Sequence, residues 1–224
     1  MVFDMAGTTV DEDNLVYKTV RNAVQRAGHE VSLETVLEHA AGKEKLQAIR
    51  DVLAVATNGS ATEETARTVY LDFVKLLDTA YAENMAKPMP GAELAFQELK
   101  AHGVNVVLNT GYSRAVAQQL LEQLGWIDHP WIDLIVTADD VQRSRPHPDM
   151  ILFAMQKLGI SDANSVGKIG DSIVDIEEGL NAGCGLVAGI TTGAQTAAQL
   201  RSANPTHVFD SLEELLETAY FSQT

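Results

Sequence analysis

Residues 2–11 read VFDMAGTTVD, a short apolar segment that leads through an acidic residue into a glycine-containing turn. Two apolar residues lead into Asp4, and Gly7 permits a tight turn directly after it. Asp4 is thus expected where a first strand ends, as a candidate nucleophile. Only Met1 to Phe3 precede it, whereas a central strand usually has about five or six residues. Either this strand is short or the native chain begins upstream.

Beyond this stretch, the pattern of apolar residues along the chain changes twice. From about residue 13 to residue 86 apolar residues recur at helical spacing, without a convincing strand. Helices are predicted there at residues 13–28, 34–41, 43–56 and 62–85. Beyond the segment KPMPG at residues 87–91, short apolar strands alternate with helices. The strands are predicted at residues 104–108, 134–136, 166–169, 186–188 and 207–209, and the helices at 93–102, 114–124, 149–158, 173–182 and 212–219.

This order predicts an α/β fold with a Rossmann-like parallel sheet, because strands that alternate with helices connect through right-handed crossovers. The core is expected to comprise residues 1–12 and 87–224, interrupted by a helical cap at residues 13–86. Asp4, Thr110, Arg145 and Asp171 each follow a predicted strand. Ligands bind at the carboxyl ends of such strands, so these residues predict one site that the helical block can cover as a lid.

The opening resembles the first motif of the haloacid-dehalogenase phosphohydrolase superfamily, a short strand running into Asp-x-Asp-Gly-Thr. The resemblance implies a C1-type cap and makes Asp4 the nucleophile, while Ala6 stands where the family has a general acid. In the phosphonoacetaldehyde hydrolase (phosphonatase) branch the motif reads Asp-x-Ala-Gly-Thr-Thr. There a cap lysine forms a Schiff base that activates a carbon leaving group.

Two further segments resemble the second and third motifs of the superfamily. The Thr110 hydroxyl and the Gly111 N–H are expected to hold phosphate oxygens, aided by the next helix N-terminus; plain helix capping is the alternative interpretation. Arg145 is expected to bind the phosphoryl group, if needed as a bidentate fork. Arg143 is a competing choice that is better interpreted as a surface charge, and His147 is interpreted as peripheral.

The segment GDSIVD at residues 170–175 resembles the fourth motif. Asp171 and Asp175 lie four positions apart at a strand-to-helix junction, which suits a hard cation with oxygen ligands. The resemblance implies that Asp4, the backbone carbonyl of Ala6 and Asp171 hold Mg²⁺, with Asp175 bonded through water or standing behind a direct ligand. An acidic helix N-terminus without metal is the alternative interpretation.

A lysine in the predicted cap points to the phosphonatase-like branch. The phosphonatase cap carries Met-Gly-x-x-Lys-x-x-His, and residues 41–48 read AGKEKLQA, so Gly42 and Lys45 match while Ala41 and Ala48 replace the Met and the His. The helical neighbours of Lys45 are small or apolar, and desolvation there would lower its pKa towards neutrality and free the amine. The two alanines are expected to leave room for a substrate. A solvent-reaching lysine stem is the alternative interpretation.

These residues predict a Mg²⁺-dependent hydrolase that breaks the P–C bond of a phosphonoacetaldehyde-like phosphonate. Lys45 would condense with the substrate carbonyl, and Asp4 would attack phosphorus. The P–C electrons would flow into the iminium to give an enamine, so no acid is needed at position 6. The group that protonates the enamine stays open, with Tyr17, His39 and Tyr112 as candidates.

Two other functions are kept as alternatives. A phosphate monoesterase of the phosphoglycolate-phosphatase kind would share metal, nucleophile and cap, but Ala6 disfavours it because general acid catalysis contributes roughly 10²–10⁴-fold. A non-catalytic phosphate- or phosphonate-binding relative is the second alternative. The intact Asp4, Arg145 and Asp171 count against it.

Composition limits the partners of the 224-residue chain. Its net charge of −15 argues against nucleic acid and anionic membranes, which are themselves polyanions. The single cysteine, Cys184, fits a reducing compartment, and no secretory signal or membrane span is visible, so a cytoplasmic enzyme is expected. The expected partner is a small phosphonate or phosphate, and a homodimer is left open. The acidic pair Glu177–Glu178 is expected on a solvated helix face.

Overall fold

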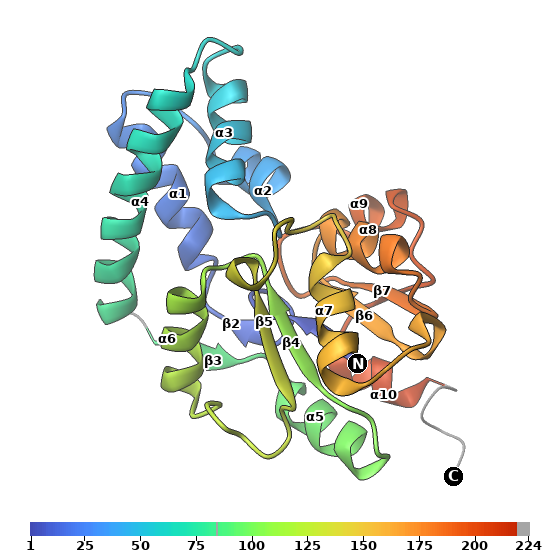
Figure 1. Ribbon diagram of the computed structural model, residues 1–224. Coiled ribbons are helices and arrows are strands. Elements are labelled where there is room, and N and C mark those ends of the chain that lie inside the picture. Colours follow the sequence, from blue (N-terminus) through green and yellow to red (C-terminus); the bar gives the residue numbers. More distant parts are fainter. Residues whose placement is uncertain (84, 219–224) are drawn as a thin grey trace.

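A parallel sheet organises the computed structural model, which describes residues 1–83 and 85–218 (Figure 1). Its strand order is β5-β4-β1-β6-β7-β8, and every neighbouring pair is parallel. The strands are β1 (Val2–Asp4), β4 (Val107–Thr110), β5 (Leu134–Thr137), β6 (Gly167–Gly170), β7 (Leu186–Ile190) and β8 (His207–Phe209). Residue 84, inside the helix predicted to about Met85, and Ala219, the predicted end of the last helix, lie outside the described residues.

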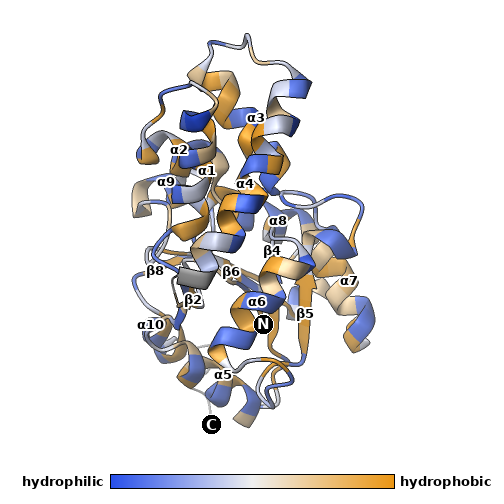
Figure 2. Cartoon of the chain, turned by 90° about the vertical axis from the view of Figure 1, so that its left-hand side faces the viewer, coloured by the Kyte–Doolittle hydropathy of each residue, from blue (hydrophilic) through white to orange (hydrophobic). Residues whose placement is uncertain are grey.

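Both faces of the sheet are covered by helices. These are α5 (Ala92–Ala101), α6 (Arg114–Leu124), α7 (Asp149–Leu158), α8 (Ile173–Ala182), α9 (Ala197–Ser202) and α10 (Leu212–Glu217). Because side chains alternate along a strand, Phe3 joins the core cluster that contains α5, α6 and α10, whereas Val2 joins the cluster that contains α7. The strands are therefore apolar on both sides, as the hydrophobic colour along β5 illustrates in Figure 2.

A group of four helices is inserted between two very short strands, β2 (Val10–Asp11) and β3 (Lys87–Pro88), which pair antiparallel. The inserted helices are α1 (Leu15–Arg26), α2 (Leu33–Ala40), α3 (Lys45–Ala56) and α4 (Glu63–Glu83). They stand to one side of the sheet, in blue to green in Figure 1. Their buried residues, such as Val20, Ile49 and Phe73, belong to the same core cluster as Phe3. The boundaries at residues 13 and 86 remain a prediction.

The α/β class with a Rossmann-like parallel sheet is confirmed, and helices α6, α7 and α8 match the predicted ranges. The strand predicted at residues 104–108 is shifted, because β4 runs from Val107 to Thr110 and ends inside the second motif. Helix α9 was missed, although the equally short α10 was predicted. The β2–β3 ribbon was missed because two residues cannot show alternation. No helix in the described part of the chain is long and apolar enough to cross a membrane.

Candidate active site

Three neighbouring strands bring the predicted motifs to one edge of the sheet. Asp4 ends β1, Thr110 ends β4, and Asp171 follows β6, while Arg145 comes from the loop that precedes α7. All four side chains are buried. Single carboxylate oxygens of Asp4, Asp171 and Asp175 lie within 4.8 Å of one another. The structure therefore places together the acidic and basic groups that the sequence placed on separate motifs.

Arg145 is the basic group at this site. Its Nη1 lies 2.7 Å from Asp4 Oδ1 and 2.9 Å from Asp175 Oδ1. Nη2 donates to the backbone carbonyl of Asn109 at 2.7 Å, which fixes the plane of the guanidinium. The competing residue Arg143 instead pairs with Asp149 at 2.9 Å near the surface. The geometry thus favours Arg145 as the phosphoryl-binding cation.

Behind Arg145 lies a buried network of three residues that the sequence analysis did not select. Glu178 accepts from Arg145 Nε at 3.1 Å and from Asn109 Nδ2 at 2.9 Å. Lys168 donates to Asn109 Oδ1 at 2.8 Å and lies 2.8 Å from Asp175 Oδ1. Asn109, Lys168 and Glu178 are each 0% exposed. This network holds Arg145 and Asp175 in fixed positions, because each of their charges has an ionic or hydrogen-bonding partner.

Glu178 corrects an expectation, since its side chain is buried and not on a solvated helix face. Its neighbour Glu177 is partly exposed. The spacing held a usable signal: Asp175 and Glu178 are three apart and therefore share a helix face. A charged residue in the apolar strand containing Lys168 was the second signal, since charged side chains are rarely buried without partners.

The acidic residues of the site outnumber the basic ones. The four acidic groups are Asp4, Asp171, Asp175 and Glu178, and the two basic groups are Arg145 and Lys168. When all six are ionised, the site carries two net negative charges. Burial, followed by the charge of Asp4, raises the pKa of Asp171 well above its usual range. Burial opposes ionisation of Asp175 as well, but Arg145 and Lys168 keep its pKa below the usual value.

A divalent cation fits this excess of charge, and the space around Asp171 is reserved by glycine. A Cβ at Gly7 would lie 2.4 Å from Asp171 Oδ2, and one at Gly193 would lie 2.0 Å from it. The same oxygen accepts a hydrogen bond from the Ala194 N–H at 2.6 Å. Asp171 has no ion pair among the described residues, and carboxylate oxygens are the ligands that Mg²⁺ prefers.

The second motif lies directly against the helical insert. Thr110 Oγ1 accepts from the Tyr112 N–H at 3.2 Å, so its own hydrogen is available to a ligand. A Cβ at Gly111 would lie 2.8 Å from the Gly42 carbonyl oxygen and 3.1 Å from that of Lys43. Only glycine therefore allows the segment that precedes α3 to pack so closely on the core.

Lys45 is the first residue of α3, two positions later than the predicted helix start. Glu44 is the N-cap, and its carboxylate accepts from Leu46 N and Gln47 N at 2.9 Å each. Residues 41 and 42 therefore precede the helix and are not on the helical face of Lys45, contrary to the expected spacing. The lysine is nevertheless buried, at 6% exposure, and so the solvent-reaching alternative does not fit the structure.

The amine of Lys45 lies in an aromatic and partly polar environment. Nζ donates to the Lys43 carbonyl at 2.7 Å and lies 5.1 Å and 4.9 Å from the ring centroids of Tyr17 and Tyr112. Burial lowers its pKa to about 8, against the opposing charges of Asp4 and Glu12. Lys43, by contrast, forms an ion pair with Asp51 at 2.6 Å. Lys45 is thus the lysine suited to act as a nucleophilic amine.

Space beside Lys45 is provided by a cavity of about 160 Å³ between the insert and α6. Lys45, Gly111 and Tyr112 line it together with apolar residues of α4, including Phe73 and Leu77. The two alanines were expected to leave room for a substrate here. Ala41 and Ala48 are instead 4% and 0% exposed and do not line this cavity. A wider cavity of about 600 Å³ adjoins Arg145 and the exposed His147.

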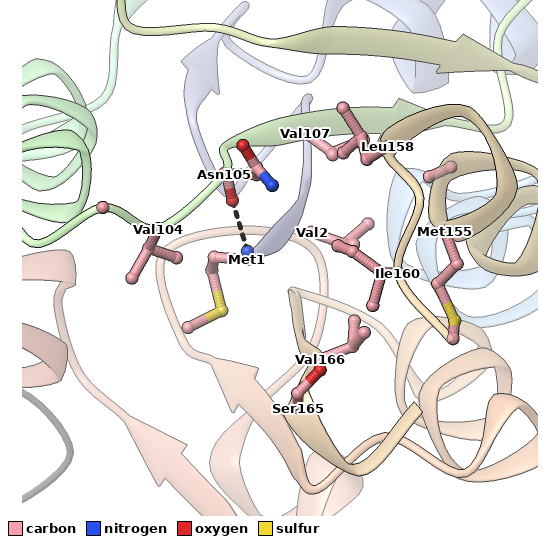
Figure 3. A pocket seen from close by; sticks show the side chains of 12 residues that line it. Met1, Val2, Val104, Asn105, Val107, Met155, Leu158, Ile160, Ser165 and Val166 are labelled. Atoms are coloured by element: carbon pink, nitrogen blue, oxygen red, sulfur yellow. Dashed lines mark hydrogen bonds between the residues drawn. The ribbon is translucent and has the colours of Figure 1, made fainter. Parts of the chain in front are cut away.

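Another cavity, of about 230 Å³, lies at the amino ends of the strands, away from this site (Figure 3). Its lining is mainly apolar, and none of its described lining residues has an ionisable side chain. The Met1 amino group donates to the Asn105 carbonyl at 2.5 Å beside it. This cavity therefore offers packing space but no groups for hydrolysis.

Comparison with known proteins assigns the family. The profile of the haloacid dehalogenase-like hydrolases matches residues 1–183, and the chain belongs to this family of hydrolases. It is 32% identical over 202 residues to a phosphonoacetaldehyde hydrolase of Bordetella pertussis, covering 86% of this chain and 72% of that protein.

Two solved structures are similar over nearly the whole chain. A phosphonoacetaldehyde hydrolase-like protein from Oleispira antarctica has a TM-score of 0.81 at 25% identity, covering 96% of this chain and 88% of that one. A predicted phosphoglycolate phosphatase from Haemophilus somnus has a TM-score of 0.79 at 21% identity, covering 96% and 95%. The latter resemblance shows the shared fold alone.

Proposed function

We propose that the protein hydrolyses the P–C bond of a phosphonoacetaldehyde-like phosphonate through a Schiff base on Lys45. The observation that carries this proposal is the buried amine of Lys45 in the cavity beside Gly111 and Tyr112. Its lowered pKa leaves an appreciable share of neutral amine near pH 8. The similarity to phosphonoacetaldehyde hydrolases supports the same substrate class.

The core residues are assigned the phosphoryl half of the reaction. Asp4 attacks phosphorus, and Arg145, 2.7 Å from Asp4, neutralises charge on the transferred group. Thr110 and Gly111 hold phosphoryl oxygens through a hydroxyl and a backbone N–H. Mg²⁺, bound by Asp4, the Ala6 carbonyl and Asp171 with Asp175 behind them, supplies charge neutralisation between two anionic reactants.

Lys45 activates the carbon leaving group. Neutral Lys45 condenses with the aldehyde, takes up one proton from the solvent and releases water, which gives a protonated iminium. When Asp4 attacks phosphorus, the P–C bond breaks and its electron pair enters the iminium to form an enamine. Water then hydrolyses the aspartyl phosphate. Because the leaving carbon is stabilised in this way, the reaction needs no acid at Ala6.

A phosphate monoesterase of the phosphoglycolate type remains the second candidate. The fold shared with the Haemophilus somnus protein is compatible with it. Ala6, however, presents no side-chain proton donor for an alcohol leaving group, and such a donor contributes roughly 10²–10⁴-fold. The lone cysteine supports a cytoplasmic location for either activity.

The test compares wild type with Lys45→Ala and the matched control Lys43→Ala. Each protein is incubated with Mg²⁺ and phosphonoacetaldehyde, inorganic phosphate and acetaldehyde are measured, and a parallel sample receives borohydride. We expect both products and a reduced N-ethyl adduct from wild type and Lys43→Ala, and neither from Lys45→Ala. Turnover by Lys45→Ala at the wild-type rate would disprove the Schiff base. Hydrolysis of alkyl phosphates without an adduct would favour the monoesterase.

A further inference from the structure

A second ionisable side chain, Glu12, is buried beside Lys45 and has no part in the chemistry described so far. It follows β2 and is 7% exposed. Its Oε2 accepts from the Val16 N–H and from the Tyr81 hydroxyl, each at 3.2 Å. Its Oε1 accepts from the Tyr112 hydroxyl at 3.3 Å. A carboxylate is therefore held by two phenols between the insert and the core.

The groups that face Glu12 come from every element packed around it. Tyr17 lies on α1, Lys45 on α3 and Tyr81 on α4, and Tyr112 lies on the loop between β4 and α6. Lys45 is the buried cation among them, and the exposed Lys87 of β3 lines one cavity together with Glu12, Asp11 and Asp13. Burial raises the pKa of Glu12 to about 7, while the Val16 and Tyr81 hydrogen bonds and the charge of Lys45 oppose the rise. At neutral pH the carboxyl group can thus release or accept a proton.

Tyr112 connects Glu12 to the reacting centre. Its ring lies under the amine of Lys45, with Nζ 4.9 Å from the centroid, and it lines the cavity that contains Lys45. Its hydroxyl donates to Glu12 Oε1 at 3.3 Å. Glu12 in turn lines two small cavities that Lys45 does not line, of about 140 Å³ and 110 Å³. The carboxyl group therefore lies between the enclosed lysine and separate space at the protein surface.

We propose that Glu12 and Tyr112 form the proton-transfer pair that serves Lys45. The inference rests on the proposed P–C hydrolysis and identifies the donor that the reaction requires. Glu12 acts through the hydroxyl of Tyr112, so it is a positioning residue and proton reservoir. The hydroxyl of Tyr17 accepts from the Gly42 N–H at 3.1 Å, and among the described residues it is Tyr81 and Tyr112 whose hydroxyls donate to Glu12.

Glu12 gives up one proton during the reaction and recovers one when acetaldehyde is released, so the proton transfers balance. After the P–C bond breaks, the terminal carbon of the enamine takes a proton from the Tyr112 hydroxyl, which takes one from the Glu12 carboxyl group. The products are an ethylidene iminium on Lys45 and an ionised Glu12. Water then adds to the iminium, acetaldehyde leaves, the neutral amine of Lys45 is restored, and the surplus proton returns to Glu12. No oxidant or reductant is consumed.

The experiment separates phosphate formation from acetaldehyde release by rapid quenching of a single turnover. Glu12→Gln is compared with Glu12→Asp, with Tyr112→Phe and with Glu64→Gln, an exposed residue of α4 that loses the same charge. In Glu12→Gln and Tyr112→Phe we expect phosphate to form while acetaldehyde release slows at least tenfold. The accumulated enamine, once protonated by a mildly acidic quench, should be reduced by borohydride to an ethyl group on Lys45. Glu12→Asp should recover part of the rate, and Glu64→Gln should match wild type.

The pH dependence provides a readout that a merely structural residue would not change. Acetaldehyde release by wild type should decline above about pH 7, as Glu12 loses its proton, and should become independent of pH in Glu12→Gln. Unchanged release in folded Glu12→Gln overturns the proposal, and so does an equal fall in both products. If Glu12→Gln does not fold, Tyr112→Phe decides by the same criteria. Absence of acetaldehyde and adduct from wild type refutes the proposed function, and the pair with it.

Discussion

Arg145 Nη1 lies 2.7 Å from Asp4 Oδ1, so the proposed nucleophile is already paired with the cation expected to bind the phosphoryl group. The contact fixes the position of one carboxylate oxygen of Asp4. Both side chains are buried, and Arg145 is fixed from behind by Glu178 and Asn109. A fork of fixed donors is required here, which a point charge on a flexible stem cannot replace.

Replacement of this arginine by lysine should therefore damage catalysis. Arg145→Lys keeps the charge but cannot reach Asp4, Asp175 and Glu178 together, and we expect kcat to fall by about 10²–10³-fold. Arg143→Lys, on the exposed ion pair with Asp149, is the control and should stay near wild type. Steady-state kinetics with both variants at saturating Mg²⁺ test this, and equal kcat values would contradict it.

The pKa of the Lys45 amine predicts how kcat/KM changes on the acid side of the pH profile. Its pKa of about 8 means that only the minority neutral form is available below that pH. We expect kcat/KM for phosphonoacetaldehyde to rise about tenfold per pH unit between pH 6 and 7 and to level off above pH 8. A profile that is flat from pH 6 to pH 8 would show that amine deprotonation does not limit the reaction.

Lys45 should also reduce stability. A pKa lowered from 10.5 to about 8 corresponds to roughly 3 kcal/mol at neutral pH, part of which its hydrogen bond to the Lys43 carbonyl offsets. We expect Lys45→Met to raise the free energy of unfolding by about 1–2 kcal/mol at pH 7, in urea titrations.

The sign of that difference follows from the proton balance. Between pH 8 and 10.5 the unfolded chain binds more protons at Lys45 than the folded protein does, so wild type gains stability as pH rises there. The advantage of Lys45→Met should shrink over this range. Lys43→Met, which loses a partly exposed ion pair with Asp51, should instead lose at most about 1 kcal/mol. A pH-independent advantage would rule out the charge as its cause.

Divalent cation binding should appear as thermal stabilisation. The excess of carboxylates around Asp171 predicts that Mg²⁺ at about one hundred times its Kd stabilises the fold by about 2.7 kcal/mol. Asp171→Asn should abolish the effect, whereas Glu122→Gln, an exposed residue of α6, should retain it. Differential scanning fluorimetry over a Mg²⁺ series measures this, and an unchanged response in Asp171→Asn would place the cation elsewhere.

Gly111 should be intolerant of even one methyl group. In Gly111→Ala the new Cβ meets the backbone of residues 42 and 43, and we expect a stability loss of about 1–3 kcal/mol with a loss of activity. Gly103→Ala faces open space but has positive φ, so it should lose about 1–2 kcal/mol and keep its activity. Comparable activity in the two variants would show that close packing of the insert on Gly111 is dispensable.

The sequence was sufficient for the strand ends and insufficient for what lies behind them. Asp4, Arg145 and Asp171 could be placed because parallel strands bring their carboxyl ends to one edge. Glu178 and Asn109 could not, because their burial depends on pairing across elements that periodicity does not relate. Asp175 and Glu178 nevertheless share one helix face, so part of this network was within reach of the pattern.

Lys45 shows how a buried residue can be selected by a partly incorrect argument. The expected helix included residues 43 and 44, but the Glu44 side chain caps the helix and so delays its start. Burial of the amine comes instead from Tyr17 and Tyr112, which are distant in sequence. Glu12 was overlooked for the same reason: nothing local distinguishes it from the exposed Asp11 and Asp13 beside it.

The β2–β3 ribbon ties the two ends of the helical insert side by side, with Val10 opposite Pro88. An inserted unit with adjacent ends can be exchanged or deleted without rerouting the rest of the chain. The phosphoryl-transfer residues are assigned to the core and the Schiff-base lysine to the insert, while Glu12 and Tyr112, the proposed proton-transfer pair, belong to the core. If the insert were replaced by one without the lysine, the same phosphoryl acceptor would face a different class of leaving group. The β2–β3 ribbon is therefore the junction at which an exchange of the insert can change the specificity of the enzyme.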